Sequence, residues 1–201
     1  MSENIRTLFL QKRNREIIEQ FQPHQVAEFL GFDDSLKLAY RLLYNAKWDE
    51  DLQDYAILLI CEVKTFYPDE WEKDWRFDAF LGSAYDVVSR DDSHYDKRYE
   101  AYRRAYQKAN PPPPELMTAL AGCIDAPGKL PISYEEAEML AKKAFAIEPY
   151  SDAAGILCAV FFAKGMEAES QHWAKIRDEL FFEKGKTPPP LEPTFVREGY
   201  E

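Results

Sequence analysis

Side chains that could bind a metal or perform acid–base chemistry are scattered along the sequence. The histidines stand far apart, at His24, His94 and His172, and no two of them have the spacing of metal ligands on one helix. The segment Gly185-Lys186-Thr187 has the residue types that end a phosphate-binding loop, but Leu180 stands where that loop needs its first glycine. No nucleophile lies in a recognised catalytic motif. The sequence therefore predicts no catalytic residue, no metal site, no cofactor and no enzyme activity.

Carboxylates are abundant, but they stand where they would stabilise helices. The runs Asp49-Glu50-Asp51 and Asp69-Glu70 fall at expected loops and helix starts, where negative charge interacts favourably with the helix dipole. The whole chain has 36 acidic against 25 basic residues and a net charge of −11. This balance argues against nucleic-acid binding and against an anionic membrane surface, and it would attract a basic protein or peptide. The alternative is that the acidity only keeps the protein soluble.

Cysteine usage and hydropathy indicate a cytoplasmic protein. The three cysteines, Cys61, Cys123 and Cys158, stand far apart among apolar or small residues, which is typical of buried thiols in a reducing compartment. The first residues have no apolar signal region, and no run of about 18 apolar residues is available to cross a membrane.

Apolar residues recur at helical spacing along nearly the whole chain, so we expect an all-α fold. The predicted helices are residues 5–21, 25–30, 35–47, 51–66, 71–89, 95–109, 114–124, 134–148, 152–164 and 167–182. Ser133 with Glu136 is a capping box before one of them. Four prolines between Pro188 and Pro193 predict an extended tail, either mobile or laid over the surface.

The helix before Pro149 carries a repeat pattern. Ala137, Ala141 and Ala144 are small residues that allow a neighbouring helix to approach closely, and Pro149 ends the helix. This segment resembles the second helix of a tetratricopeptide repeat. Leu81, Gly82 and Tyr85 are similarly spaced to the Leu-Gly-x-x-Tyr of that family's first helix.

The resemblance covers about residues 35–183 and implies a right-handed superhelical stack of antiparallel helix pairs. Residues 1–34 would form N-terminal capping helices, residues 35–183 four helix pairs, and residues 184–201 the proline-rich tail. The alternative is a generic α-helical bundle with alanine-rich interfaces.

In this family, ligands lie in the groove formed by the first helix of each pair. Carried over by register, the partner-binding residues would be Arg41, Asn45, Trp48, Arg76, Ser83 and Asp86. Arg41 and Asn45 are similar to half of a carboxylate clamp, but Phe80, Leu116 and Leu120 stand where the clamp needs amide or basic groups.

The resemblance and the absence of a catalytic motif together imply a protein-interaction scaffold. An adaptor or chaperone-like module would bind a peptide or a helical segment of a partner in its groove. One alternative is an immunity- or inhibitor-type protein that neutralises a basic toxin or enzyme. A third is an enzyme on a helical scaffold, because a fold does not determine an activity.

Overall fold

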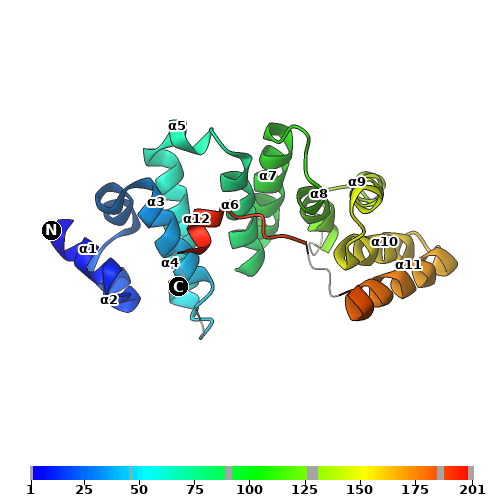
Figure 1. The fold of residues 1–201 in the computed structure, drawn as a ribbon, viewed down its shortest axis with the longest axis horizontal. Helices are drawn as coiled ribbons and strands as arrows, with labels where there is room; N and C mark the ends of the chain where they lie inside the picture. Colours follow the sequence, from blue (N-terminus) through cyan, green and yellow to red (C-terminus); the bar gives the residue numbers. More distant parts are fainter. Residues whose placement is uncertain (1, 46, 89–91, 126–130, 185–187, 199–201) are drawn as a thin grey trace. The chain divides into compact units, whose positions relative to one another are not determined.

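The computed structural model of the chain describes residues 2–45, 47–88, 92–125, 131–184 and 188–198. All regular secondary structure in these ranges is helical (Figure 1), which confirms the predicted all-α class. The chain folds as two compact units, residues 1–90 with 192–201, and residues 91–191. This division differs from the predicted cap, repeats and tail: it cuts the predicted repeat region at residue 90, and it assigns the end of the tail to the first unit.

The first unit contains α1 (Ser2–Leu10), α2 (Asn14–Gln20), α3 (Pro23–Leu43), α4 (Glu50–Phe66), α5 (Pro68–Trp71), α6 (Trp75–Val87) and α12 (Thr194–Arg197). Its centre is the packing of α3 against α4, and α1, α2, α5 and α6 pack around this pair. Leu36, Leu42, Leu59 and Ile60 are fully buried there. Removing such apolar surface from water is the main stabilising contribution in the unit.

Two breaks in the first unit differ from the prediction. The single helix expected over residues 5–21 is two helices, because Lys12 adopts a left-handed φ of 55° between them. Conversely, the helices expected over 25–30 and 35–47 form one kinked helix, α3. Its kink is at Gly31, with φ 81° and ψ −177°, a conformation that only glycine adopts readily. Ser35, where the second of these helices was expected to begin, is buried inside α3, and its hydroxyl donates to the carbonyl of Val26.

A buried polar cluster joins α4, α5 and α6. The carboxylate of Asp78 is fully buried and accepts hydrogen bonds from Trp71 Nε1 at 3.0 Å and Lys64 Nζ at 2.9 Å. Trp71 is itself fully buried. The helix expected over 71–89 begins later, as α6 at Trp75, because Asp74 caps it by accepting from the amide of Arg76, and Trp71 instead ends α5.

The second unit contains α7 (Asp92–Lys108), α8 (Pro114–Ala121), η1 (Gly122–Asp125), α9 (Tyr134–Ile147), α10 (Ser151–Ala163), α11 (Glu167–Glu179) and η2 (Leu180–Lys184). From α7 to α11, each α-helix packs on the next. Of the predicted capping box, the structure shows the bond in which Ser133 Oγ accepts from the amide of Glu136. Ala137, Ala141 and Ala144 are fully buried in the interfaces of α9, as their small size suggested.

Three local expectations need correction. The loop expected over residues 90–94 is already helical from Asp92, and residues 126–130 of the expected 125–133 loop lie outside the described residues. The tail is not extended throughout, because residues 194–197 form α12 on the surface of α3. Cys123 is buried, but Cys61 and Cys158 are only half-buried.

Candidate functional site

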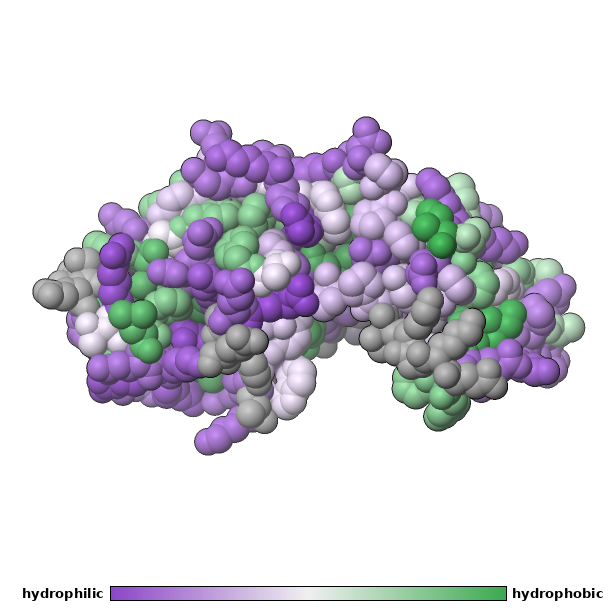
Figure 2. Space-filling view, viewed as in Figure 1, coloured by the Kyte–Doolittle hydropathy of each residue, from purple (hydrophilic) through white to green (hydrophobic). Residues whose placement is uncertain are grey.

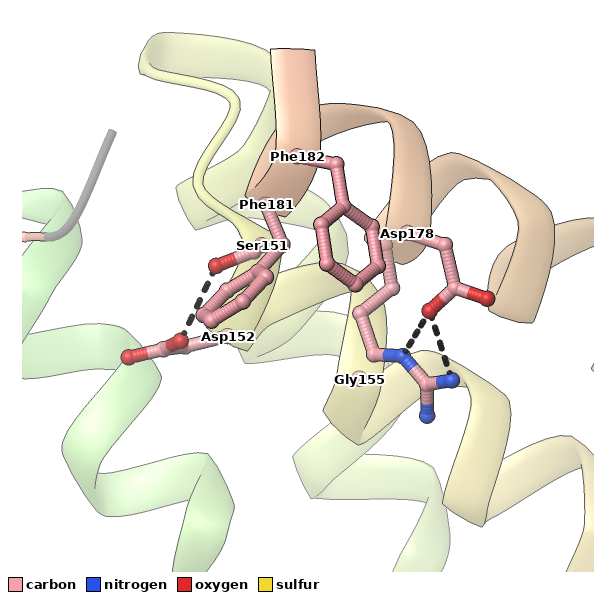
Figure 3. A pocket seen from close by; sticks show the side chains of 7 residues that line it. Ser151, Asp152, Gly155, Asp178, Phe181 and Phe182 are labelled. Carbon is pink, nitrogen blue, oxygen red and sulfur yellow. Dashed lines mark hydrogen bonds and ion pairs between the residues drawn. The ribbon is translucent and has the colours of Figure 1, made fainter. Parts of the chain in front are cut away.

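A pocket of about 330 Å³ opens in the second unit between α10 and the end of α11 (Figure 3). It is lined by Ser151, Asp152, Gly155, Arg177, Asp178, Phe181 and Phe182. The first three stand in the first turns of α10, and the other four stand at the end of α11 and in η2. The pocket is thus built where one helix begins and its antiparallel neighbour ends.

Two adjacent phenylalanines form the apolar rim of this pocket. Successive helical residues point about 100° apart, so a helix with one face in the core cannot bury three consecutive side chains. In Leu180-Phe181-Phe182, Leu180 takes the core position at 6% exposure. Phe181 and Phe182 remain 59% and 80% exposed, with their rings edge to face at 5.2 Å. Figure 2 shows apolar side chains in pale green at the surface where α11 ends, at the lower right.

The two rings face different parts of the pocket. Figure 3 draws the ring of Phe181 beside Ser151 and Asp152, and the ring of Phe182 beside Asp178. The π-type turn of η2 orients them, since its wider spacing changes the direction of side chains relative to an α-helix. Turns of this kind are frequent at functional sites.

The side chain of Arg177 packs over Gly155. A Cβ at position 155 would lie 3.4 Å from Arg177 Cδ, so the aliphatic part of the arginine covers the glycine. The guanidinium donates from Nε and Nη2 to Asp178 Oδ1, at 2.9 and 2.7 Å. Asp152 accepts from Ser151 Oγ at 3.2 Å. The polar edge of the pocket therefore has two carboxylates, of which one is paired with a guanidinium.

The lining of this pocket offers two carboxylates, a guanidinium, a hydroxyl and two aromatic rings to a bound molecule. Among the described residues, no histidine, cysteine or lysine lines the pocket, and its serine donates to the carboxylate of Asp152. Across the described ranges, no group of three His, Cys, Asp or Glu side chains could hold a metal ion. None of the described helices has the length and apolar character needed to span a membrane.

The first unit has a shallower cleft between α2 and α4, of about 490 Å³. It is lined by Arg15, Ile18, Glu19, Asp51, Asp54, Tyr55 and Leu58. Arg15 is paired with Asp49 at 3.3 Å and with Asp51 at 3.4 Å, so the unit's own arginine already neutralises part of the acidic edge. Burial raises the pKa of Tyr55, whose hydroxyl donates to the carbonyl of Phe21.

The six predicted partner-binding residues all lie in the first unit, and the contacts of Arg41, Asn45 and Arg76 there are defined. Arg41 is buried against α1: it donates to the carbonyl of Phe9 at 3.3 Å, and its guanidinium lies 4.5 Å above the Phe9 ring. Burial lowers its pKa. Asn45 donates to the carbonyl of Leu42 and thereby ends α3. Arg76 forms an ion pair with Asp74 at 2.7 Å.

The other three lie after α3 and on α6. Trp48 is 61% exposed in the connection between α3 and α4, with a φ of 50°. Ser83 is half-buried and Asp86 exposed on α6. The structure does not gather the six residues around one pocket, and their role in binding stays a prediction.

Phe181, Phe182 and Gly155 were not among the predicted site residues. The sequence contained a signal for the first two, because Leu180-Phe181-Phe182 is a run of large apolar residues at a helix end, where at least one must face solvent. Gly155 had no comparable signal, since its role depends on Arg177 from another helix.

The sequence was also compared with known proteins. No protein-family model matches the chain, and no curated protein is significantly similar to it.

Proposed function

We propose that the protein is a protein-binding module that holds a segment of a partner at the pocket between α10 and α11. The observation that carries this proposal is the exposed pair Phe181 and Phe182 at the pocket's rim. Aromatic side chains and arginine are enriched at the centres of protein interfaces, and both kinds are present beside this cavity. The partner would insert an apolar anchor between the two rings and the floor formed by Gly155.

Burial of these rings is worth enough to support an interface. Covering one phenylalanine stabilises a complex by about 1.5–3 kcal/mol relative to leaving it in water. Arg177 can serve as a flat platform at the same place because Asp178 already fixes its guanidinium. Such a preordered rim reduces the conformational entropy lost on binding.

The charges around the pocket favour a partner with a basic residue next to its anchor. Asp152 and Asp178 are both exposed at the pocket, and the chain as a whole carries a net charge of −11. This negative charge would attract a lysine or arginine of the partner and so speed association. The attraction would weaken as salt is added.

The proposal also includes a divergent tetratricopeptide-like arrangement of the helix pairs. The support is that small residues are buried in the interfaces of α9 and that consecutive helices from α7 to α11 pack on one another. Arrays of helix pairs commonly present extended surfaces to other proteins.

The test is affinity capture from native extract with quantitative comparison of three forms of the full chain. These are the wild type, the double variant Phe181→Ala with Phe182→Ala, and the control Phe162→Ala. Phe162 is 75% exposed in the same unit, at the other end of α10. The control therefore also removes an exposed phenylalanine ring, but one that does not line the pocket.

We expect the double variant to retain at least tenfold less of each captured protein than the wild type and Phe162→Ala do. Equal retention by all three forms, with all three folded by circular dichroism, would reject this pocket as the binding site.

A further inference from the structure

The end of the chain returns to the first unit and lies on α3. Residues 192–201 cluster with residues 1–90, and α12 packs against α3, where Figure 1 shows it in red. Val196 is fully buried and Pro193 is buried, whereas Thr194 and Glu198 face solvent. A short segment thus occupies the surface formed by α3 and the start of α6, and we call residues 192–198 the docked segment.

Three side chains of the docked segment have defined positions. Glu192 is nearly buried, and its Oε1 accepts a hydrogen bond from Tyr44 Oη at 3.1 Å. The ring of Phe195 meets the ring of Phe77 at 6.2 Å in an edge-to-face arrangement. Val196 fills an apolar position between these contacts and the body of the unit.

The acceptor surface is aromatic and continues beyond these contacts. Phe77 also packs edge to face on Phe32 at 4.9 Å and lies 5.7 Å from Trp71. Beside Tyr44, the ring of Tyr40 is 4.7 Å away. These residues come from α3, the residue after it, α5 and α6. Their rings form an aromatic surface that also packs against the rest of the unit.

The docked segment cannot hold its shape alone. Its helix has four residues, whereas isolated helices shorter than about 12–15 residues are marginal in water. Three prolines at 188–190 precede it and favour an extended chain with no internal hydrogen bonds. The segment is therefore bound as a peptide would be, by a few side chains in a surface formed by other helices.

We propose that this surface of the first unit is a peptide-binding groove whose resident ligand is the docked segment, and that a partner segment of the same chemistry replaces it. The partner would present a carboxylate to Tyr44 and, after a proline and one short turn, an aromatic and a β-branched residue. This site does not involve the pocket in the second unit, so a test of one proposal does not decide the other.

Exchange is physically reasonable because the covalent link only raises the local concentration of the docked segment. A tethered ligand competes at an effective concentration on the order of millimolar, so a free peptide binds the wild type weakly until the resident segment is released. Segments held by few buried contacts detach with far less free energy than unfolding of the whole unit needs.

The test uses the full chain and a fluorescent peptide with the sequence of residues 191–198. Val196→Asp places a charge in the buried position and should release the resident segment, so we expect fluorescence polarisation to show binding at least tenfold tighter than to the wild type. Glu198→Ala, at an exposed position of the same segment, is the matched control and should behave as the wild type does. The peptide with the Val196→Asp change should not bind any form.

Three results would overturn the proposal. The first is a folded Val196→Asp chain that binds no peptide, and the second is equal affinity of that variant and the wild type. If Val196→Asp shows no cooperative unfolding and so is not folded, the test uses Phe195→Ala instead. Equal peptide affinity of Phe195→Ala and the wild type would again contradict the proposed exchange. The third is a wild-type chain that is dimeric in light scattering and becomes monomeric with Val196→Asp. The docked segment would then bind a second copy of the chain, and no different partner would replace it.

Discussion

Tyr44 and Glu192 are 148 positions apart in the sequence, and a hydrogen bond of 3.1 Å joins their side chains. The hydroxyl of Tyr44, just after α3, donates to a carboxylate that is nearly buried. Two further contacts of the docked segment are apolar: Phe195 lies on Phe77, and Val196 is in the interior. The hydrogen bond therefore aligns the segment, while the apolar contacts supply most of its binding free energy.

Tyr44→Phe removes this donor and keeps the ring. A hydrogen bond to a charged group contributes about 1.5–3 kcal/mol, but Glu192 lies close enough to the surface for water to replace part of it. We expect a loss of about 1 kcal/mol, which corresponds to roughly fivefold faster amide hydrogen exchange in residues 195–197. Thr194→Ala, at an exposed position, should leave that exchange rate unchanged, and an equal effect of the two changes would contradict the role given to Tyr44.

The cluster around Asp78 predicts an asymmetry between two substitutions. Lys64→Met leaves a fully buried carboxylate without its ammonium partner, which costs about 3 kcal/mol or more. Asp78→Asn keeps an oxygen that can accept from Trp71 and leaves a lysine that can turn toward water, so it should cost about 1 kcal/mol. Urea unfolding followed by tryptophan fluorescence gives both values. A larger loss for Asp78→Asn than for Lys64→Met would be inconsistent with this account.

Two glycine-to-alanine changes should have opposite signs. Gly31 has φ 81° with ψ −177°, so alanine there should destabilise the first unit by about 1–3 kcal/mol, although no neighbouring atom is in the way. Gly155 is helical, and a Cβ would make ordinary contact with Arg177 at 3.4 Å. Gly155→Ala should therefore stabilise the second unit by about 0.5–1 kcal/mol. Thermal unfolding of the two variants measures both, and the same sign for both would refute the backbone argument.

Stability should fall in acid partly because of Glu138. Hydrogen bonds from Lys142 and Lys164 hold the pKa of this carboxyl below its usual value. A lowered folded-state pKa stabilises the fold above the unfolded value of about 4.3, and this contribution is lost as the pH falls from there through the folded value. Glu138→Gln should lower the free energy of unfolding at pH 7 but have little effect at pH 3. Equal effects at the two pH values would show that the ion pairs do not contribute.

The all-α class was predictable from the sequence because helical periodicity is local, but the breaks in the helices were not. Lys12 turns the chain out of a helix in a segment whose apolar spacing is continuous. Gly31 was expected to end a helix, yet the following residues continue into the same kinked helix. In both cases, packing against other helices decides the backbone conformation.

The positions of the two proposed binding surfaces depend on contacts between distant residues. The prolines of the tail correctly indicated a segment without regular structure at residues 188–193, but docking of Val196 depends on α3, which the tail's sequence does not reveal. Likewise, Arg41 suggested a ligand-binding guanidinium, and the structure places it against Phe9 inside the first unit. The sequence gives the type of each side chain, but it does not give the residues that surround that side chain in the fold.

Photo-crosslinking at position 182 tests the central claim, that the protein holds a partner at the pocket between α10 and α11. Benzoyl-phenylalanine replaces Phe182 in one form of the full chain and Phe162 in the control, both exposed phenylalanines of the same unit. We expect discrete crosslinked species in cells from position 182 that are absent from position 162 and are lost when Phe181→Ala is added. No crosslinked species from position 182, or the same species from both positions, would contradict it.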